Sequence, residues 1–157
     1  QESGLSAFTL TDEQIEMIWK YLGGSMFEIS YILGELIPLA KNKCVETESI
    51  QKEIDRLISM NEGKLSFYAS INQGKRLLFR DILSVHQQKE MFRIDDLESL
   101  VEKGFYDETG LINELSNLVR MNILAFYPTT AHYMLQGNSM YYGLEKYINR
   151  VFSDNNQ

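Results

Sequence analysis

Apolar residues recur at helical spacing near the start of the chain and predict a first helix within residues 10–22. A capping box opens this helix, because the Thr11 side chain can accept from the backbone of Gln14 while the Gln14 side chain reaches back to Thr11. The pattern indicates an amphipathic helix that packs one face on a core. The residues predicted to face inward are Ile15, Ile18, Trp19 and Leu22.

A pair of glycines, Gly23 and Gly24, ends this helix, and a second apolar segment begins directly afterwards. Glycine tolerates positive φ and close backbone approach, so the pair predicts a tight corner between two helices. The apolar residues of the second helix, within residues 25–42, lie on nearly every side. This pattern predicts a helix that is buried all round, and Pro38 is expected to kink or end it.

Two further helices are predicted in the middle of the chain. The first lies within residues 46–63, carries its apolar residues on one stripe, and has Gly63 as its predicted stop. The second is predicted over residues 66–86, with an interruption at Gly74. The stripe of the first helix is Ile50, Ile54, Leu57 and Ile58.

The last third of the chain combines helices with a hairpin. Short helices are predicted within residues 93–104 and 107–122, followed by strands at 123–128 and 133–136 and a final helix over 139–152. Helices joined by a short turn that contains glycine, followed by a hairpin, are typical of a winged helix. The second of these helices is predicted to turn inward Ile112, Leu115, Leu118 and Val119.

These patterns together predict a mostly α-helical fold in two parts. A helical segment is expected over residues 8–62, and a winged-helix domain with a small β-hairpin wing over residues 63–152. The remaining residues, 153–157, are expected to form a frayed tail. The length of 157 residues suffices for one ordinary domain or for two very small ones.

Composition narrows the classes of function. The net charge of −7 disfavours the phosphate neutralisation on which nucleic-acid binding depends. Cys44 is the only cysteine, so no disulfide framework is expected and a reducing cytoplasm is the predicted location. No apolar run reaches the length of a bilayer span, so no membrane partner is expected. The start of the chain lacks a signal-peptide pattern and an initiating Met, which predicts a fragment or processed chain with a further domain upstream.

The sequence contains no recognisable pattern for catalysis or metal binding. A phosphate-binding loop needs a hydroxyl residue directly after Gly-Lys, but none follows the Gly-Lys pairs at 63–64 and 74–75. His86 and His132 are far apart, and the one cysteine has no companion, so each histidine is expected to be a surface or hairpin residue. We therefore expect no catalytic residue, no metal ligand and no cofactor within this chain.

Residues 118–148, LVRMNILAFYPTTAHYMLQGNSMYYGLEKYI, resemble the C-terminal end of archaeal-type P-loop ATPases, which are AAA-like and STAND-related proteins. That family ends with a strand, a wing, a Gln-Ser element and a last helix. The matching strand in this chain is 122–128. Gln136 and Ser139 match the Gln-Ser element, although two residues stand between them here.

Residues 10–29, LTDEQIEMIWKYLGGSMFEI, resemble the lid segment of the same family, in which a helix runs into a Gly-Gly-x-Pro corner. Gly23, Gly24 and Ser25 match the first three positions of that corner, and Met26 stands where proline is usual. The resemblance implies that the lid follows a nucleotide-binding core and closes over ATP and Mg²⁺ held there. It also implies that the three matching residues lie beside the nucleotide. Without the resemblance, the corner is a helix cap and a turn between packed helices.

The expected function is the non-catalytic C-terminal regulatory and interaction portion of a P-loop ATPase. The lid would pack on an upstream core of the same protein, and the winged helix would engage another protein. The alternatives are a free-standing winged-helix regulator that binds DNA and an interaction module with no ATPase relative. Acidic residues outnumber basic ones on the helix that would enter the major groove, which disfavours DNA. The candidate nucleic-acid contacts are Lys75, Arg76, Arg80 and Arg120.

Overall fold

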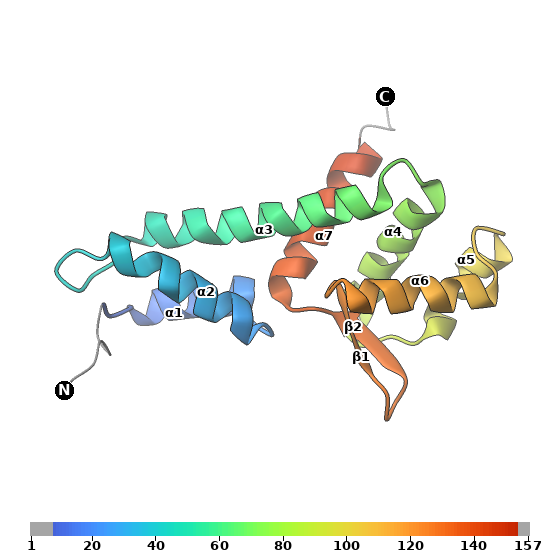
Figure 1. Cartoon of the computed structure of the whole chain (residues 1–157), viewed down its shortest axis with the longest axis horizontal. Helices are drawn as coiled ribbons and strands as arrows, with labels where there is room; N and C mark the ends of the chain where they lie inside the picture. The colour runs from blue at the N-terminus through green and yellow to red at the C-terminus, as the bar shows by residue number, and fades with distance from the viewer. Residues whose placement is uncertain (1–7, 154–157) are drawn as a thin grey trace.

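The computed structural model describes residues 8–153 and shows a mostly helical chain with one small antiparallel sheet, as the sequence predicts. The described residues form an elongated molecule in which one long helix, α3, runs past helices at both ends (Figure 1). Of the predicted tail, residues 153–157, Ser153 is instead the last residue of a helix, and residues 154–157 lie outside the described residues. The helices are α1 (Asp12–Leu22), α2 (Met26–Leu36), α3 (Thr47–Ala69), α4 (Gln73–Gln88), α5 (Glu98–Glu102), α6 (Glu108–Arg120) and α7 (Asn138–Ser153), and the strands are β1 (Leu124–Tyr127) and β2 (His132–Leu135).

Helix α1 begins with the predicted capping box. The Gln14 N–H donates to Thr11 Oγ1 over 3.1 Å, and the Thr11 N–H donates to Gln14 Oε1 over 3.0 Å. The buried apolar side chains are Ile18 and Leu22. The predictions that Ile15 and Trp19 face inward are wrong, because 41% and 56% of these side chains are exposed. Since α1 packs through a narrow stripe only, a residue one position away from that stripe lies in water.

Helix α2 also differs from its prediction. It ends at Leu36 and continues as a 3-10 turn, Ile37–Leu39, that contains Pro38, so the expected effect of the proline is confirmed. The prediction of burial all round is wrong, because Met26 and Phe27 are 67% and 81% exposed. Helix α2 packs mainly on α1, on α3 and on the 3-10 turn that follows it, which leaves Met26 and Phe27 in water.

Helix α3 runs through the predicted stop at Gly63 and ends six residues later, at Ala69. A glycine inside a helix is unfavourable by roughly 1 kcal/mol relative to alanine, which burial of Leu65 and Ala69 outweighs. The break before α4 therefore falls at Ser70, whose φ of 47° ends the helix, rather than at Gly74. The predicted boundary between residues 62 and 63 lies within α3.

Two separate hydrophobic cores share α3. The N-terminal core joins α1, α2 and the first half of α3 and contains eight buried residues, which are Ile18, Leu22, Ile32, Leu36, Val45, Ile50, Ile54 and Leu57. The C-terminal core contains twenty buried residues, drawn from the end of α3, from α4 to α7 and from the hairpin. Because one helix enters both cores, the two parts of the molecule are joined by a continuous rod rather than by a linker.

Helix α7 crosses α3 at close range and ties the C-terminal core to it (Figure 1). Gly143 makes this approach possible, since a Cβ at this position would lie 2.9 Å from Asn61 Cβ and 3.2 Å from the Ile58 carbonyl oxygen. The fully buried Ser139 accepts a hydrogen bond from Asn61 Nδ2 over 3.0 Å at the same crossing. The α3–α7 contact therefore depends on a glycine that no sequence pattern singled out.

Strands β1 and β2 form the predicted hairpin, with Leu124 opposite Leu135 and Tyr127 opposite His132. A third segment extends this sheet on the other side of β2. The Phe92 N–H donates to the Tyr133 carbonyl oxygen over 2.9 Å, and the Tyr133 N–H donates back over 2.7 Å. The order along the chain in this part is thus α4, the single β-bridge residue Phe92, α5, α6 and the hairpin.

Candidate functional site

The double-glycine corner between α1 and α2 packs on the turn that precedes α7. Gly24 has a φ of 86° and faces Gly137, so that a Cβ on Gly24 would lie 3.1 Å from Gly137 Cα. A side chain at Gly23 would press against the Trp19 carbonyl oxygen, 2.4 Å from the Cβ position. The Gly23 carbonyl oxygen accepts from the Asn138 N–H over 2.8 Å. Gly24 therefore allows the close contact with Gly137, and Gly23 allows the chain to turn directly after α1.

Asn138 also holds the end of α1. Its Nδ2 group donates to the Lys20 carbonyl oxygen over 3.1 Å and to the Trp19 carbonyl oxygen over 3.4 Å. The Trp19 carbonyl oxygen also accepts from the Gly23 N–H over 2.9 Å, so Asn138 supplies a second donor there. Carbonyl groups in the last turn of a helix generally lack partners within the helix itself. On the other side of the corner, Ser25 caps α2 by accepting from the Glu28 N–H over 3.2 Å. The corner thus has an architectural role in this chain, joining α1, α2 and α7.

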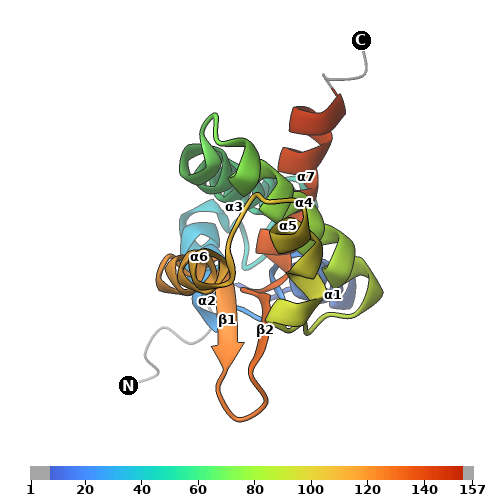
Figure 2. The same cartoon turned by 90° about the vertical axis from the view of Figure 1, so that its right-hand side faces the viewer.

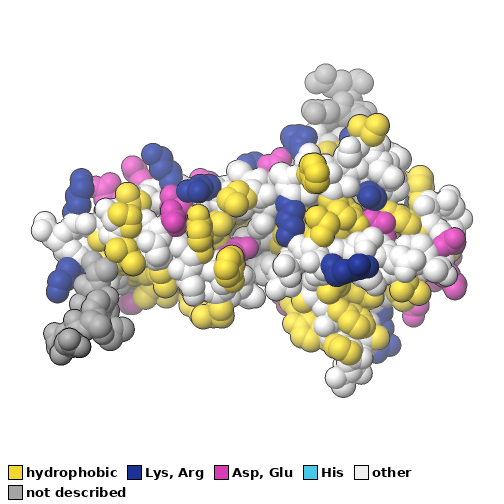
Figure 3. Space-filling model, viewed as in Figure 1, with side chains coloured by type: hydrophobic (Ala, Val, Ile, Leu, Met, Phe, Trp, Pro, Cys, Tyr) yellow, Lys and Arg dark blue, Asp and Glu magenta, His cyan; other side chains and the backbone are white. Residues whose placement is uncertain are grey.

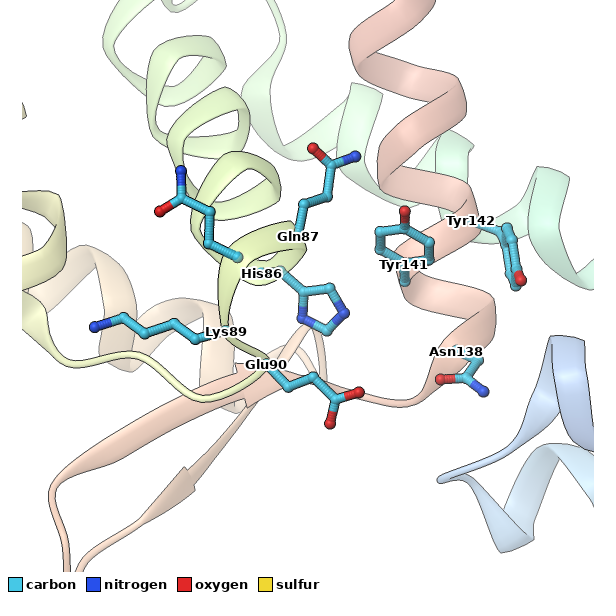
Figure 4. Close-up of a pocket in the computed structure, with 8 residues that line it drawn as sticks. His86, Gln87, Lys89, Glu90, Asn138, Tyr141 and Tyr142 are labelled. Carbon is cyan, nitrogen blue, oxygen red and sulfur yellow. The ribbon is translucent and has the colours of Figure 1, made fainter.

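Two adjoining cavities lie beside this corner. The larger has a volume of about 390 Å³ and opens between the end of α4 and the start of α7 (Figure 4). The smaller, of about 160 Å³, lies between Gly23, Gly24 and the hairpin. His86, Glu90 and Asn138 line both cavities. The larger cavity is lined by His86, Gln87, Gln88, Lys89, Glu90, Asn138, Tyr141 and Tyr142.

His86 is the titratable group at the centre of these cavities. Burial lowers the pKa of His86, and the nearby Glu90 carboxylate opposes this effect without reversing it. The ring lies 5.0 Å from the Tyr141 ring, between centroids, and points toward it in Figure 4. His86 is thus half-buried, which corrects the prediction of a surface residue. Because its pKa is lowered, His86 is neutral at pH 7 and can accept as well as donate a hydrogen bond.

The predicted basic cluster on α4 makes contacts within the chain. Lys75 Nζ lies 3.8 Å from Glu114 Oε1. Arg76 Nε donates to the Ser70 carbonyl oxygen over 3.2 Å. Arg80 Nε lies 3.5 Å from its neighbour, the Asp81 carboxylate. Three of the four candidate nucleic-acid contacts therefore have partners already.

Arg120, the fourth candidate, is exposed at the end of α6. Within residues 8–153 it makes no ion pair. It belongs to a different helix from the other three candidates, Lys75, Arg76 and Arg80, which all lie on α4. An isolated arginine supplies one phosphate contact, whereas protein–DNA complexes commonly use several.

Glu114 is held from a second side by Tyr68, whose hydroxyl donates a hydrogen bond to the carboxylate. Burial raises the pKa of Tyr68, and this hydrogen bond raises it further. Lys75 Nζ also lies 4.5 Å from the centre of the Tyr68 ring. The three side chains join α3, α4 and α6 as one polar network, so their arrangement serves packing rather than an external ligand.

Exposed apolar side chains flank the corner, which sequence reasoning missed. Trp19 precedes the two glycines, and Met26 and Phe27 follow them. All three are more than half exposed. Figure 3 shows hydrophobic side chains on the visible surface over α2 and over the hairpin. The pattern that could have indicated this exposure is the apolar character of α2 on nearly every side. The small N-terminal core buries only part of that apolar surface.

Comparison with known proteins found no family model, no curated protein and no solved structure that matches this chain. Within residues 8–153, no three side chains among His, Cys, Asp and Glu are grouped so that they could hold a metal ion. None of the described helices combines the length and the apolar character needed to cross a bilayer.

Proposed function

We propose that this chain is a non-catalytic regulatory and interaction part of a P-loop ATPase. In this proposal the α1–α2 corner docks on a nucleotide-binding core, and the part from α4 to α7 forms a winged helix that engages a second protein. The observation that carries the proposal is the exposure of Trp19, Met26 and Phe27 around the double glycine.

Physical chemistry supports a partner at this corner. Burying a large apolar side chain contributes roughly 1.5–3 kcal/mol, and three such side chains close to the double glycine in the sequence are exposed to water. Exposed apolar patches commonly mark protein contact sites. The resemblance of residues 10–29 to an ATPase lid implies which surface covers them, namely the core on which such a lid closes. This core would be the source of the ATP and Mg²⁺ chemistry.

The arrangement of the C-terminal part supports the winged-helix assignment. Phe92 pairs with β2 from a position between α4 and α5, so the sheet has three short segments in an order that winged helices use. The DNA-binding alternative gains no support from the charges. Helix α6 begins with Glu108 after an acidic cap, Asp107, and the basic residues of α4 have internal partners.

Trp19 allows a direct test, because it is the only tryptophan of the chain and lies in the proposed contact. The chain is produced with 5-fluorotryptophan and titrated with the unlabelled polypeptide encoded upstream of Gln1. The ¹⁹F resonance of Trp19 is expected to shift as the side chain leaves water. Phe27→Ser is expected to weaken binding about tenfold, as the loss of one buried aromatic side chain implies.

Ile71→Ser serves as the matched control for this test. Ile71 is 88% exposed, similar to Phe27, but lies in the turn between α3 and α4, at the other end of the molecule from α1 and α2 (Figure 1). Binding is expected to remain unchanged in this variant. A Trp19 resonance that does not move at saturating partner, or equal effects of the two substitutions, would contradict the proposal.

A further inference from the structure

A groove lies between the 3-10 turn Ile94–Leu97, α5 and α6, at the end of the molecule away from the N-terminal core (Figure 1). Its volume is about 280 Å³. Figure 2 looks onto this end of the molecule, where α5 and α6 lie side by side. The residues that line the groove are of two kinds only, apolar (Ile94, Val101, Leu111 and Ile112) and acidic (Asp95, Glu98, Glu102 and Glu108).

The apolar floor of the groove depends on the rotation of α6. Ile112 was predicted to face inward, but 48% of its side chain is exposed. The buried stripe of α6 is instead Leu111, Leu115 and Leu118, which turns Ile112 toward α5. Val101 and Ile94 are only partly buried on the facing side. The groove therefore presents apolar surface that the C-terminal core does not cover.

The acidic rim has no ion-pair partner among the described residues. Asp95, Glu98, Glu102 and Glu108 make no ion pair with any residue between 8 and 153, although neighbouring acids do. Asp96, for example, lies 2.7 Å from Lys89 Nζ. No lysine or arginine lines the groove. Like charges around an apolar concavity reinforce one another's field, so the groove attracts cations and repels anions.

We propose that this groove binds a basic amphipathic helix of a partner protein. Apolar side chains of such a helix would sit on Val101, Leu111 and Ile112, and its lysine or arginine side chains would meet the acidic rim. The groove is slightly smaller than the roughly 300 Å³ at which small-molecule pockets begin, which suits one or two inserted side chains. An apolar helix face laid into a hydrophobic groove is a common mode of peptide recognition.

Other occupants fit these observations less well. A polyanion such as DNA would meet four carboxylates and no base. A metal ion needs ligands that converge, and the acids of the described chain form no group of three that could hold one. Acidic side chains spread along both helices of the groove match several separated cations, as a helix with repeated lysines presents them.

The inference deepens one half of the proposed function, because the groove belongs to the part from α4 to α7 that was proposed to engage a second protein, but it does not rest on the ATPase contact. The ATPase contact was assigned to α1 and α2, whereas the groove belongs to α5 and α6, at the far end of α3 (Figure 1). Acidic side chains gather at this end in the space-filling view as well (Figure 3). A loss of binding at one surface therefore leaves the other measurable.

The test uses three fluorescein-labelled peptides of about 15 residues, near the length at which helices begin to be stable. The first is an amphipathic peptide of leucine and lysine, the second has glutamate in place of lysine, and the third has the first composition in scrambled order. Fluorescence anisotropy against the whole chain is expected to show binding of the first peptide only. Binding should weaken as salt rises from about 0.01 to about 1 M, where the Debye length falls from about 30 to about 3 Å.

Substitutions then locate the contact. Glu102→Lys, in the last turn of α5, is expected to weaken binding of the first peptide about tenfold, because it places like charges together. Ile112→Ser removes exposed apolar surface and is expected to weaken binding of the same peptide roughly fivefold. The control is Glu16→Lys, which makes the same change of net charge on the exposed face of α1 and should leave the dissociation constant within about twofold. ¹⁵N NMR should place the shifts on α5 and the start of α6.

Several results would overturn the inference. These are no binding of the first peptide, equal binding of the acidic or scrambled peptide, equal effects of Glu102→Lys and Glu16→Lys, and NMR shifts centred on α1 and α2. Self-association of the chain that Ile112→Ser abolishes would assign the groove to a second copy instead. If Ile112→Ser disturbs folding, as NMR dispersion will show, Glu102→Lys decides the question alone.

Discussion

The two cores that share α3 differ in how completely they are closed. The C-terminal core buries large aromatic side chains, including Phe79 and Tyr147, whose rings meet edge to face with centroids 5.8 Å apart. The N-terminal core contains no fully buried aromatic residue and leaves Trp19 and Phe27 largely in water. One core covers its own apolar surface, whereas the other has more apolar surface than it covers.

The difference follows from the number of elements around each core. Two helices and one half of α3 surround the N-terminal core, so the outer face of α2 has nothing to pack on. Small units bury a smaller fraction of their surface than large ones. The open side of the N-terminal core is therefore where a partner gains the most by binding, which is the physical basis of the proposed docking at the corner.

The strongest test of this comparison replaces one phenylalanine in each part. Phe79→Ala empties a site in the closed core, where Phe79 is 1% exposed, and is expected to reduce the free energy of unfolding by about 3–5 kcal/mol. Phe27→Ala removes the same atoms from the open side and should change it by less than about 0.5 kcal/mol. Urea unfolding followed by circular dichroism measures both. Similar losses for the two variants would show that Phe27 is packed in solution.

Glycines on α3 and α7 test the joint between the cores. Gly143→Ala places a methyl group 2.9 Å from Asn61 Cβ and 3.1 Å from the Glu62 nitrogen, and is expected to reduce the free energy of unfolding by about 1–3 kcal/mol. Gly63→Ala, with nothing within 4 Å of the new Cβ, should increase it by about 0.5–1 kcal/mol. Opposite signs in thermal unfolding support the close α3–α7 crossing. Stabilisation by Gly143→Ala would contradict it.

Asn138 tests the contact between the corner and α7. Asn138→Ala removes the side-chain hydrogen bonds to the Trp19 and Lys20 carbonyl oxygens, and is expected to reduce the free energy of unfolding by about 1 kcal/mol. The Trp19 emission should change in the same variant, because the last turn of α1 loses the side-chain hydrogen bonds from Asn138. Asn113→Ala is the control, since this exposed side chain of α6 makes no hydrogen bond within the described residues. An unchanged Trp19 spectrum would argue against the contact.

The smallest expected effect is a pH dependence at His86, which lies in the cavity between the two parts. Burial lowers its pKa in the folded state, so the unfolded chain binds the proton more readily, and stability falls as the pH drops below about 6.5 and through the folded pKa. His86→Gln should therefore lose less stability than the natural chain between about pH 7.5 and 5.5. Urea midpoints at the two pH values measure this. Equal losses in both proteins would remove His86 as the cause.

Local patterns were read correctly from the sequence. The capping box of Thr11 and Gln14, the end of α2 shortly before Pro38 and the hairpin all depend on residues that lie within a few positions of one another. Such features depend on backbone geometry and short-range hydrogen bonds, which are determined by residues close together in the sequence. The mostly helical class follows from the same kind of signal.

The features that were missed depend on tertiary packing. Gly63 was predicted to end a helix, but burial of residues later in α3 carried the helix past it. Trp19 and Ile112 were placed on the wrong side because a periodic pattern defines a face only to within about one residue, some 100° of rotation. The groove of α5 and α6 depends on the rotation of α6 that leaves Ile112 exposed, so it could not be predicted from the pattern of either helix alone.

Because α3 is continuous, its number of residues fixes the relative rotation of the two halves as well as the distance between them. Each residue advances a helix by 1.5 Å and turns it by about 100°. The 23 residues of α3 therefore set the angle between the corner proposed for docking and the acidic groove. One inserted residue after Leu57 would rotate one half against the other. It would also separate Asn138 from the end of α1. The length of α3 therefore fixes the relative orientation of two partners bound at both surfaces. Insertions and deletions can change that orientation only by about 100° per residue.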